Sequence, residues 1–139
     1  MYLTEKHICL VDDDQDENAL FLNALKKVDA GTRLTYFSCC RDLLEFLEYS
    51  DNLPGVIVLD IYMPKEDGLA CLAKIKASKK TSPIPVIIYS STHSEKAKED
   101  ALGLGAADFF VKPIDIDDMQ IMIKKALSVC SDISTRLKS

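Results

Sequence analysis

The run at residues 56–60, Val-Ile-Val-Leu-Asp, constrains the fold of this chain more than any other segment. Four consecutive apolar residues, most of them β-branched, are typical of a strand buried on both faces of a parallel sheet. The run ends at Asp60, and a turn-forming segment at 61–68 follows, so we expect Asp60 at the carboxyl end of a central strand. Ligands bind at that edge in open α/β sheets, although an aspartate there can also simply cap a loop.

A second short apolar run, residues 7–11, ends in the acidic triplet Asp12, Asp13 and Asp14. Two buried parallel strands that both end in acids crowd their carboxylates at one edge of the sheet. Adjacent carboxylates repel one another, so such a cluster is costly unless a cation binds in it. A hard divalent ion with oxygen ligands, most simply Mg²⁺, relieves the repulsion. Capping of the following helix explains Asp14 or Asp16, but it leaves Asp12 and Asp13 unexplained.

Strand and helix patterns alternate along the whole chain. Five such pairs predict one α/β domain, a (βα)5 doubly wound, flavodoxin-like parallel sheet with strand order 2-1-3-4-5. We expect a single domain over residues 1–139 with its core at about 5–130. The expected strands are 7–11, 34–38, 56–60, 85–89 and 108–111, and the expected helices are 16–29, 41–49, 68–77, 92–102 and 117 to about 137.

The start of the fourth helix is predicted from Thr92 and Glu95, which have capping-box spacing. Its apolar positions are Ala97, Ala101 and Leu102. Because these include few large side chains, we expect this helix to be held lightly to the rest of the domain.

Composition excludes several classes of protein. With 47% hydrophobic and 28% charged residues, the 139-residue chain is typical of a globular domain. A net charge of −5 argues against a general binder of nucleic acid or membrane surfaces. There is no apolar run of the ~20 residues that a membrane span requires, and the N-terminus lacks the pattern of a secretory signal. We therefore expect a cytoplasmic protein.

The five cysteines are odd in number and have no CxxC spacing. Cys9 and Cys71 lie within apolar patterns and are predicted to be small core residues. Adjacent cysteines such as Cys39 and Cys40 rarely form a stable disulfide with each other, and no histidine lies near them in sequence. We therefore expect reduced thiols without a redox role, in keeping with the cytoplasm.

Polar residues at the strand ends form a set suited to phosphoryl transfer. Asp60 is a candidate nucleophile that forms an acyl phosphate, and Asp12 and Asp13 are candidate Mg²⁺ ligands. Lys112, after the fifth strand, is an ammonium that can pair with Asp60 and then with a phosphoryl oxygen. The hydroxyl of Ser90, after the fourth strand, can donate a hydrogen bond to another phosphoryl oxygen. Taken singly, Lys112 is also explained as a surface lysine and Ser90 as a capping residue.

The same residues carry a resemblance to a known family. The segments 11–13 (Val-Asp-Asp), 59–68 (Leu-Asp through Met-Pro to Asp-Gly), 90–91 (Ser-Ser) and 111–113 (Val-Lys-Pro) match, in order and spacing, the motifs of response-regulator receiver domains of two-component signalling. The resemblance covers about residues 5–130.

The resemblance implies a role for each site residue. Asp60 is the phosphoacceptor, Asp12 and Asp13 are the acidic pair, and Ser90 and Lys112 are the switch hydroxyl and the lysine of the family motif. The family's Mg²⁺ also takes the backbone carbonyl two residues after the acceptor, here Tyr62. The implied phosphodonor is a sensor histidine kinase or a histidine phosphotransfer protein.

Three positions depart from the commonest family pattern. Ser90 replaces the more frequent threonine, and Phe109 stands where many members carry a switch tyrosine. Phe109 can still move between exposed and buried positions, but it has no hydroxyl. Tyr62 and Thr92 occupy positions that, in this family, tune the loss of phosphate, and a bulky Tyr62 predicts slow self-dephosphorylation.

The resemblance is to stand-alone, chemotaxis-type regulators, which are signalling proteins rather than dedicated enzymes. Residues 131–139 are too few for a DNA-binding domain, so output is expected through an unidentified protein target, from a monomer or a phosphorylation-dependent homodimer. One alternative is a phosphatase or phosphotransferase of the haloacid-dehalogenase type, but that family has an aspartate two residues after the nucleophile, where this chain has Tyr62. Another is a receiver fold that binds partners without ever accepting phosphate. Nucleotide binding is disfavoured because no Gly-rich phosphate loop follows a strand.

Overall fold

A computed structural model describes residues 6–63 and 65–138, with the backbone alone for 131–138. One sheet contains five strands, in the order β2-β1-β3-β6-β7, and all its neighbouring strands are parallel. The predicted doubly wound fold and strand order are therefore confirmed. The strands of this sheet are β1 (His7–Val11), β2 (Arg33–Phe37), β3 (Val56–Asp60), β6 (Val86–Ser90) and β7 (Asp108–Val111).

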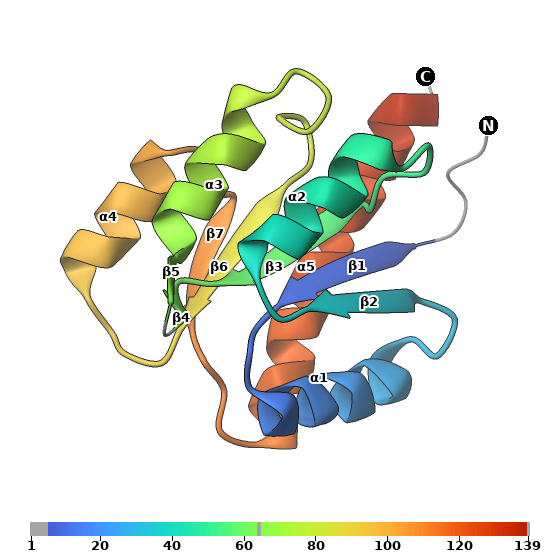
Figure 1. Cartoon of the computed structure of the whole chain (residues 1–139). Coiled ribbons are helices and arrows are strands. Elements are labelled where there is room, and N and C mark those ends of the chain that lie inside the picture. The colour runs from blue at the N-terminus through green and yellow to red at the C-terminus, as the bar shows by residue number, and fades with distance from the viewer. Residues whose placement is uncertain (1–5, 64, 139) are drawn as a thin grey trace.

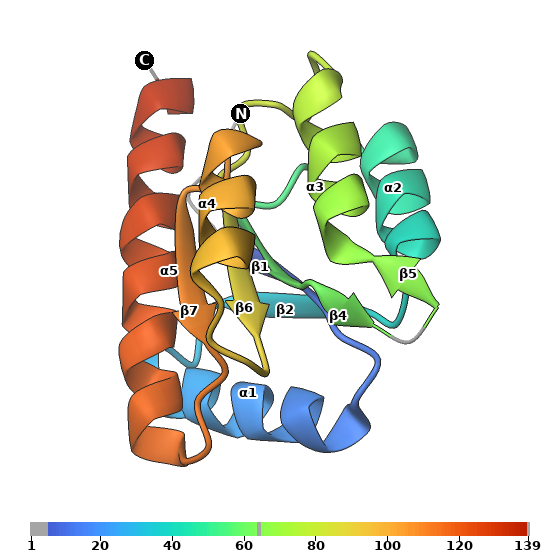
Figure 2. The same cartoon turned by 90° about the vertical axis from the view of Figure 1, so that its left-hand side faces the viewer.

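Five helices cover the two faces of the sheet (Figures 1 and 2). On one face, α1 packs against α5, and on the other lie α2, α3 and α4. Strands β1, β3 and β6 are buried along their whole length, which explains why their sequences are apolar without alternation. In the part of the chain that the structure describes, none of the helices has the length and apolar character needed to cross a bilayer. The helices are α1 (Gln15–Val28), α2 (Cys40–Tyr49), α3 (Gly68–Ala77), α4 (Glu95–Gly103) and α5 (Ile116–Lys138).

A small antiparallel hairpin, β4 (Tyr62–Met63) and β5 (Glu66–Asp67), follows the central strand. The sequence analysis did not predict it, because two-residue strands are too short to show an apolar period. The hairpin occupies the segment that was expected to be a turn. It connects Asp60 directly to the start of α3.

The helix starts are only partly as predicted. Asp14 caps α1, as expected, by accepting hydrogen bonds from the backbone N–H groups of Asp16 and Glu17. The start of α4 was placed wrongly, because Ser94 caps this helix and accepts from the N–H of Ala97 at 3.1 Å. Thr92 instead lies in the preceding loop, since two hydroxyl residues compete for one cap in this stretch.

Helix α4 presents a narrow apolar face to the sheet. Its buried residues are Ala97 and Ala101, which lie four positions apart on the same side of the helix. Leu102, predicted to be inward, is 44% exposed because the next position points about 100° away. The helix is therefore anchored by small side chains.

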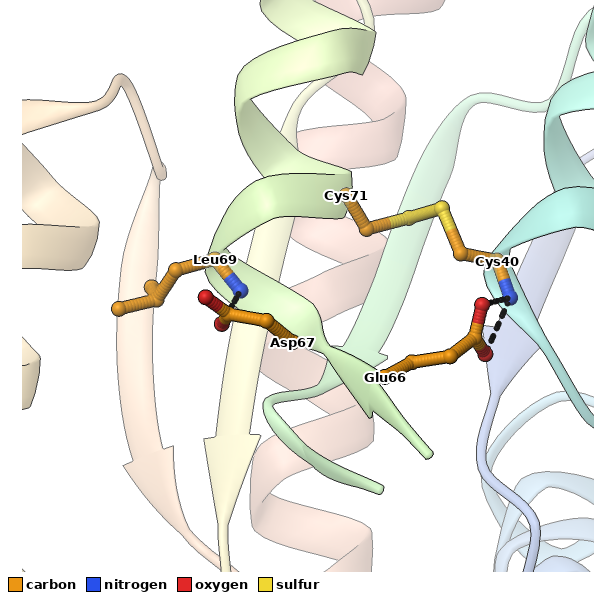
Figure 3. Close-up of a disulfide and its surroundings, with 5 residues drawn as sticks. All are labelled: Cys40, Glu66, Asp67, Leu69 and Cys71. Carbon is orange, nitrogen blue, oxygen red and sulfur yellow. Dashed lines mark hydrogen bonds between the residues drawn. A yellow bond between two sulfur atoms is a disulfide. The ribbon is translucent and has the colours of Figure 1, made fainter. Parts of the chain in front are cut away.

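A disulfide joins Cys40, at the start of α2, to Cys71 in α3 (Figure 3). The expectation of reduced thiols is wrong for this pair, although Cys71 is a buried core residue as predicted. The partner of Cys40 is not its neighbour Cys39 but a residue 31 positions away, with the two Cα atoms 5.9 Å apart. Cys9, Cys39 and Cys130 are free thiols.

Figure 3 also shows how the hairpin is attached to α2. The backbone N–H of Cys40 donates to the two carboxylate oxygens of Glu66, at 2.9 and 3.1 Å. This hydrogen bond satisfies an N–H of the helix start, which has no partner within the helix. Asp67, next in sequence, caps α3 by accepting from the N–H of Leu69 at 2.9 Å. The hairpin is thus connected to both helices that the disulfide joins.

Candidate functional site

The carboxyl edge of the main sheet brings together residues from four strands. Strands β1 and β3 are neighbours and pair Val11 with Leu59, so the next residues along, Asp12 and Asp60, end the two strands side by side. Strand β7 ends at Val111, and the following Lys112 donates its backbone N–H to the carbonyl of Ser90 at 2.7 Å. The strand order therefore places both signs of charge at one edge.

Asp12, Asp13 and Asp60 form an acidic cluster. One carboxylate oxygen from each lies within 4.8 Å of the others. Asp12 and Asp60 are buried, whereas Asp13 is exposed. Three carboxylate oxygens suit a hard divalent cation such as Mg²⁺. Binding such a cation would also relieve the repulsion between the carboxylates. The expected site is therefore chemically suited to the metal.

Backbone N–H groups hold the two buried carboxylates. Asp12 Oδ1 accepts from the N–H of Asp14 at 2.9 Å, and Asp60 Oδ1 accepts from the N–H of Tyr62 at 2.9 Å. Both bonds run from the second residue after the aspartate, which is the Asx-turn pattern. Each aspartate thus has one oxygen bound by its own loop.

The ammonium of Lys112 contacts three carboxylates. Its Nζ lies 2.9 Å from Asp60 Oδ2, 3.3 Å from Asp12 Oδ2 and 2.7 Å from Glu17 Oε2. The lysine side chain is 11% exposed, so these are partly desolvated pairs rather than surface contacts. The same Nζ lies 4.9 Å from the centre of the Tyr89 ring, within the range of a cation–π contact.

The site perturbs the protonation equilibria of its members. Burial raises the pKa of Asp60, and the hydrogen bonds from Lys112 and from the Tyr62 N–H only partly counteract this effect. Burial likewise raises the pKa of Glu17, against the opposing effect of Lys112. Burial alone lowers the pKa of Lys112, but the hydrogen bonds to Glu17 and Asp60 outweigh it, and the net pKa is raised. Lys112 therefore carries its positive charge throughout the physiological pH range.

The remaining predicted residues make contacts of their own. The buried Ser90 hydroxyl donates to the carbonyl of Thr92 at 2.7 Å, so it is occupied by its own loop. Phe109 is 8% exposed and already packs in the core beneath α2, α3 and α4, so the ring needs no inward movement to be buried. The side chain of Tyr62 is half-exposed at the start of the hairpin.

Two residues of the site were missed by the sequence analysis. Glu17 lies in the first turn of α1, where an acid is ordinarily explained by the helix dipole. Tyr89 lies inside an apolar run and was assigned only to a strand. A signal existed for Tyr89, because a tyrosine in a fully buried strand usually has a hydrogen-bond partner for its hydroxyl. Its hydroxyl donates to Asp12 Oδ2.

The fold and the site together define a doubly wound α/β protein with a carboxylate cluster and a lysine at the switch point of the sheet. A model of the family described as response regulator receiver domain matches residues 8–124. The chain belongs to this family, and it is a signalling domain of a two-component response regulator.

Individual relatives agree with this assignment. The chain is 32% identical over 153 residues to the transcriptional regulatory protein FixJ of Bradyrhizobium diazoefficiens, covering 98% of this chain and 68% of FixJ. It is 35% identical over 121 residues to the DNA-binding transcriptional regulator NtrC of Escherichia coli, covering 87% of this chain and 24% of NtrC. Its fold matches the crystal structure of the Mn²⁺-bound form of response regulator Rcp1, with a TM-score of 0.75 and 26% identity over 86% of this chain and 90% of Rcp1. NtrC is thus much longer than the segment it shares with this chain.

Proposed function

We propose that this chain is a phosphorylation-dependent switch in which Asp60 accepts a phosphoryl group. The observation that carries the proposal is the position of the Asp60 carboxylate. It is buried, it lies within 4.8 Å of the Asp12 and Asp13 oxygens, and its Oδ2 is 2.9 Å from Lys112 Nζ. A carboxylate between a cation-binding cluster and an ammonium suits nucleophilic attack on phosphorus, where negative charge must be neutralised.

The phosphodonor is a phosphohistidine of a sensor histidine kinase or of a histidine phosphotransfer protein. A carboxylate oxygen of Asp60 forms a bond to phosphorus while the phosphorus–nitrogen bond of the donor breaks. The donor ring carries a proton on its other nitrogen, so it leaves as a neutral imidazole on the partner. Asp12, Asp13, Asp60 and the backbone carbonyl of Tyr62 would hold Mg²⁺, which would neutralise the charge of the phosphoryl oxygens. The Mn²⁺-bound form of the relative Rcp1 supports a divalent ion in a fold of this kind.

Lys112 and Ser90 bind the oxygens of the new phosphoryl group. Lys112 Nζ exchanges its contact with Asp60 Oδ2 for one with a phosphoryl oxygen. The lysine therefore loses no ion pair when Asp60 is phosphorylated. Ser90 leaves the Thr92 carbonyl and donates to a second phosphoryl oxygen, so the loop after β6 moves with it. This loop leads into α4, whose anchors are two alanines. The phosphate therefore favours one of two arrangements of the loop and helix.

Output passes through the surface formed by α4, β7 and α5 to a downstream protein target. We propose that the domain acts as a monomer or as a phosphorylation-dependent homodimer. The competing function is a receiver fold that binds its partner constitutively. The proposed switch and the constitutive module have the same fold, so only the chemistry at Asp60 distinguishes these two functions.

The test is intact mass spectrometry after incubation with Mg²⁺ and acetyl phosphate, with Asp60→Asn in parallel. We expect the parent protein to gain one phosphoryl group and the variant to gain none. Removal of Mg²⁺ with a chelator should abolish the gain in the parent. A parent protein that binds Mg²⁺ but never gains mass would favour the constitutive module. Gain of mass by Asp60→Asn as well would place the acceptor elsewhere.

A further inference from the structure

Tyr89 connects the interior of the domain to the acidic cluster. Its side chain is completely buried among the residues between the sheet and helices α1 and α5, and its hydroxyl donates to Asp12 Oδ2. We propose that Tyr89 is a positioning residue that fixes the Asp12 carboxylate for divalent-cation binding and for phosphoryl transfer to Asp60. The inference rests on the proposed function. It adds Tyr89, which was not among the predicted site residues.

The strand order explains why a tyrosine is needed at this position. Tyr89 lies on β6 and pairs in register with Asp60 on β3, while Asp12 follows β1 on the other side of β3. Because neighbouring strands are about 4.8 Å apart, β6 and β1 are separated by about 10 Å. Only a long side chain with a polar end spans one intervening strand and still donates a hydrogen bond. A leucine or valine here would fill the core without reaching Asp12.

The hydroxyl completes the set of donors around Asp12. Oδ1 accepts from the N–H of Asp14 at 2.9 Å, and Oδ2 faces both the Tyr89 hydroxyl and Lys112 Nζ, the latter at 3.3 Å. Donors on both oxygens fix the carboxylate plane. Residues that orient a metal ligand in this way typically change metal affinity by about 10- to 100-fold when they are replaced.

Tyr89 also links the cluster to the lysine. The ammonium of Lys112 lies 4.9 Å from the centre of the Tyr89 ring and contacts the same Asp12 oxygen as the Tyr89 hydroxyl. When Lys112 shifts toward a phosphoryl oxygen, the hydroxyl remains as a donor to Asp12 Oδ2. Asp12 Oδ2 therefore keeps a hydrogen-bond donor in both states of the switch, which Lys112 alone would not provide.

The experiment compares Tyr89→Phe with Tyr36→Phe by calorimetric titration with Mg²⁺ and by phosphorylation with acetyl phosphate. Tyr89→Phe keeps the ring and loses only the hydroxyl, and Tyr36→Phe removes a hydroxyl from a half-exposed tyrosine on β2. We expect Tyr89→Phe to weaken Mg²⁺ binding about tenfold and Tyr36→Phe to leave it unchanged. Phosphorylation of Tyr89→Phe should recover at saturating Mg²⁺.

A double-mutant cycle with Asp12→Asn tests whether the effect passes through Asp12. In that background, Tyr89→Phe should change Mg²⁺ affinity much less than in the parent, because the carboxylate it positions is gone. An equal effect in both backgrounds would overturn the inference, as would parental affinity in Tyr89→Phe. A parent that neither binds Mg²⁺ nor accepts phosphate would instead overturn the proposed function.

A second measurement covers the case in which Tyr89→Phe does not fold. The parent protein labelled with 3-fluorotyrosine can be titrated with Mg²⁺ while the fluorine resonances are recorded. The resonance of Tyr89 is recognised by its protection from a soluble paramagnetic reagent, since this side chain is fully buried. We expect this resonance to shift with the same midpoint as Mg²⁺ binding, and an unshifted resonance would contradict the inference.

Discussion

The ammonium of Lys112 lies closer to Glu17, at 2.7 Å, than to Asp60, at 2.9 Å. Glu17 therefore competes with Asp60 for the lysine, and in the proposed function its charge would lie beside the incoming phosphoryl group. Since Glu17 is 32% exposed, solvent screens this interaction, and we expect an effect of at most about 1 kcal/mol.

Glu17→Gln should accordingly favour the phosphorylated state. At subsaturating acetyl phosphate and fixed Mg²⁺, the phosphorylated fraction measured by intact mass should correspond to an equilibrium about two- to fivefold more favourable than in the parent. Glu45→Gln, which removes an exposed acid from α2, is the matched control and should behave like the parent. A lower phosphorylated fraction in Glu17→Gln would mean that Glu17 instead helps to hold Lys112 in place.

The raised pKa of Asp60 predicts a pH-dependent stability. Because ionised Asp60 is less favourable in the folded than in the unfolded chain, folding stability falls as the pH rises from the ordinary value of 3.8 through the raised folded-state pKa. Asp60→Asn removes this effect. Without Mg²⁺, the melting temperature of the variant relative to the parent should increase with pH over this interval and then become constant. A difference that is independent of pH in thermal melts would contradict the prediction.

The same variant should respond differently to the metal. Saturating Mg²⁺ should raise the melting temperature of the parent, because a ligand that binds only the folded state stabilises it. Asp60→Asn should gain less, since it offers one carboxylate fewer to the cation.

Gly68 makes a close approach that other residues cannot make. A Cβ at this position would lie 2.6 Å from the carbonyl oxygen of Asp60 and would also meet the Cα of Ile61. Both atoms belong to the backbone, so neither can rotate away. We expect Gly68→Ala to cost about 1–3 kcal/mol in urea denaturation, in the range of overpacked cores. Gly103→Ala is the control, because a Cβ there meets no atom within 4 Å, and it should not destabilise the protein.

The disulfide predicts a stability that depends on the redox conditions. Closing a loop between cysteines 31 positions apart is worth about 3–4 kcal/mol in the chain-entropy model. A reductant, or the double substitution Cys40→Ser with Cys71→Ser, should therefore lower the unfolding free energy by an amount of this order. Cys39→Ser should leave it unchanged, because Cys39 is a free thiol.

The covalent state itself is checked by alkylation of the denatured protein. Without reductant, three of the five cysteines should be alkylated, and all five after reduction. Alkylation of all five without reductant would show that the bond does not form.

The slow self-dephosphorylation expected from Tyr62 stays a prediction. The side chain is 50% exposed beside the loop of Asp60 and can limit access of water to an acyl phosphate on that residue. Tyr62→Ala should therefore shorten the phosphate lifetime, by about tenfold if shielding is worth about 1.4 kcal/mol. Decay of the phosphorylated mass after removal of acetyl phosphate measures this rate, and an unchanged rate would exclude shielding by Tyr62.

The five strands of the main sheet were predicted to within one residue, because burial of a parallel sheet imposes long apolar runs on the sequence. The same physics explains the placement of residues at the strand ends. Asp12, Asp60 and Lys112 follow directly after such runs, and the strand order then brings them together.

What was missed depends on contacts between distant segments. No local pattern shows that Cys40 faces Cys71 across two helices, or that Glu66 binds the start of α2. Ser94 was not predicted as the cap of α4, because the nearby Thr92 has an equally suitable hydroxyl in the local sequence. Tyr89 had an apolar explanation as a strand residue, and its second role becomes visible only when Asp12 is placed two strands away.

The disulfide makes α2 and α3 one rigid unit, separate from α4, on the same face of the sheet. These two helices are tied covalently and through Glu66, whereas their neighbour α4 is held by Ala97 and Ala101 alone among its buried residues. A strain introduced at the carboxyl edge will be relieved where resistance is lowest. If Asp60 is phosphorylated as proposed, we therefore expect α4 to move rather than α2 or α3, because the disulfide holds those two helices together.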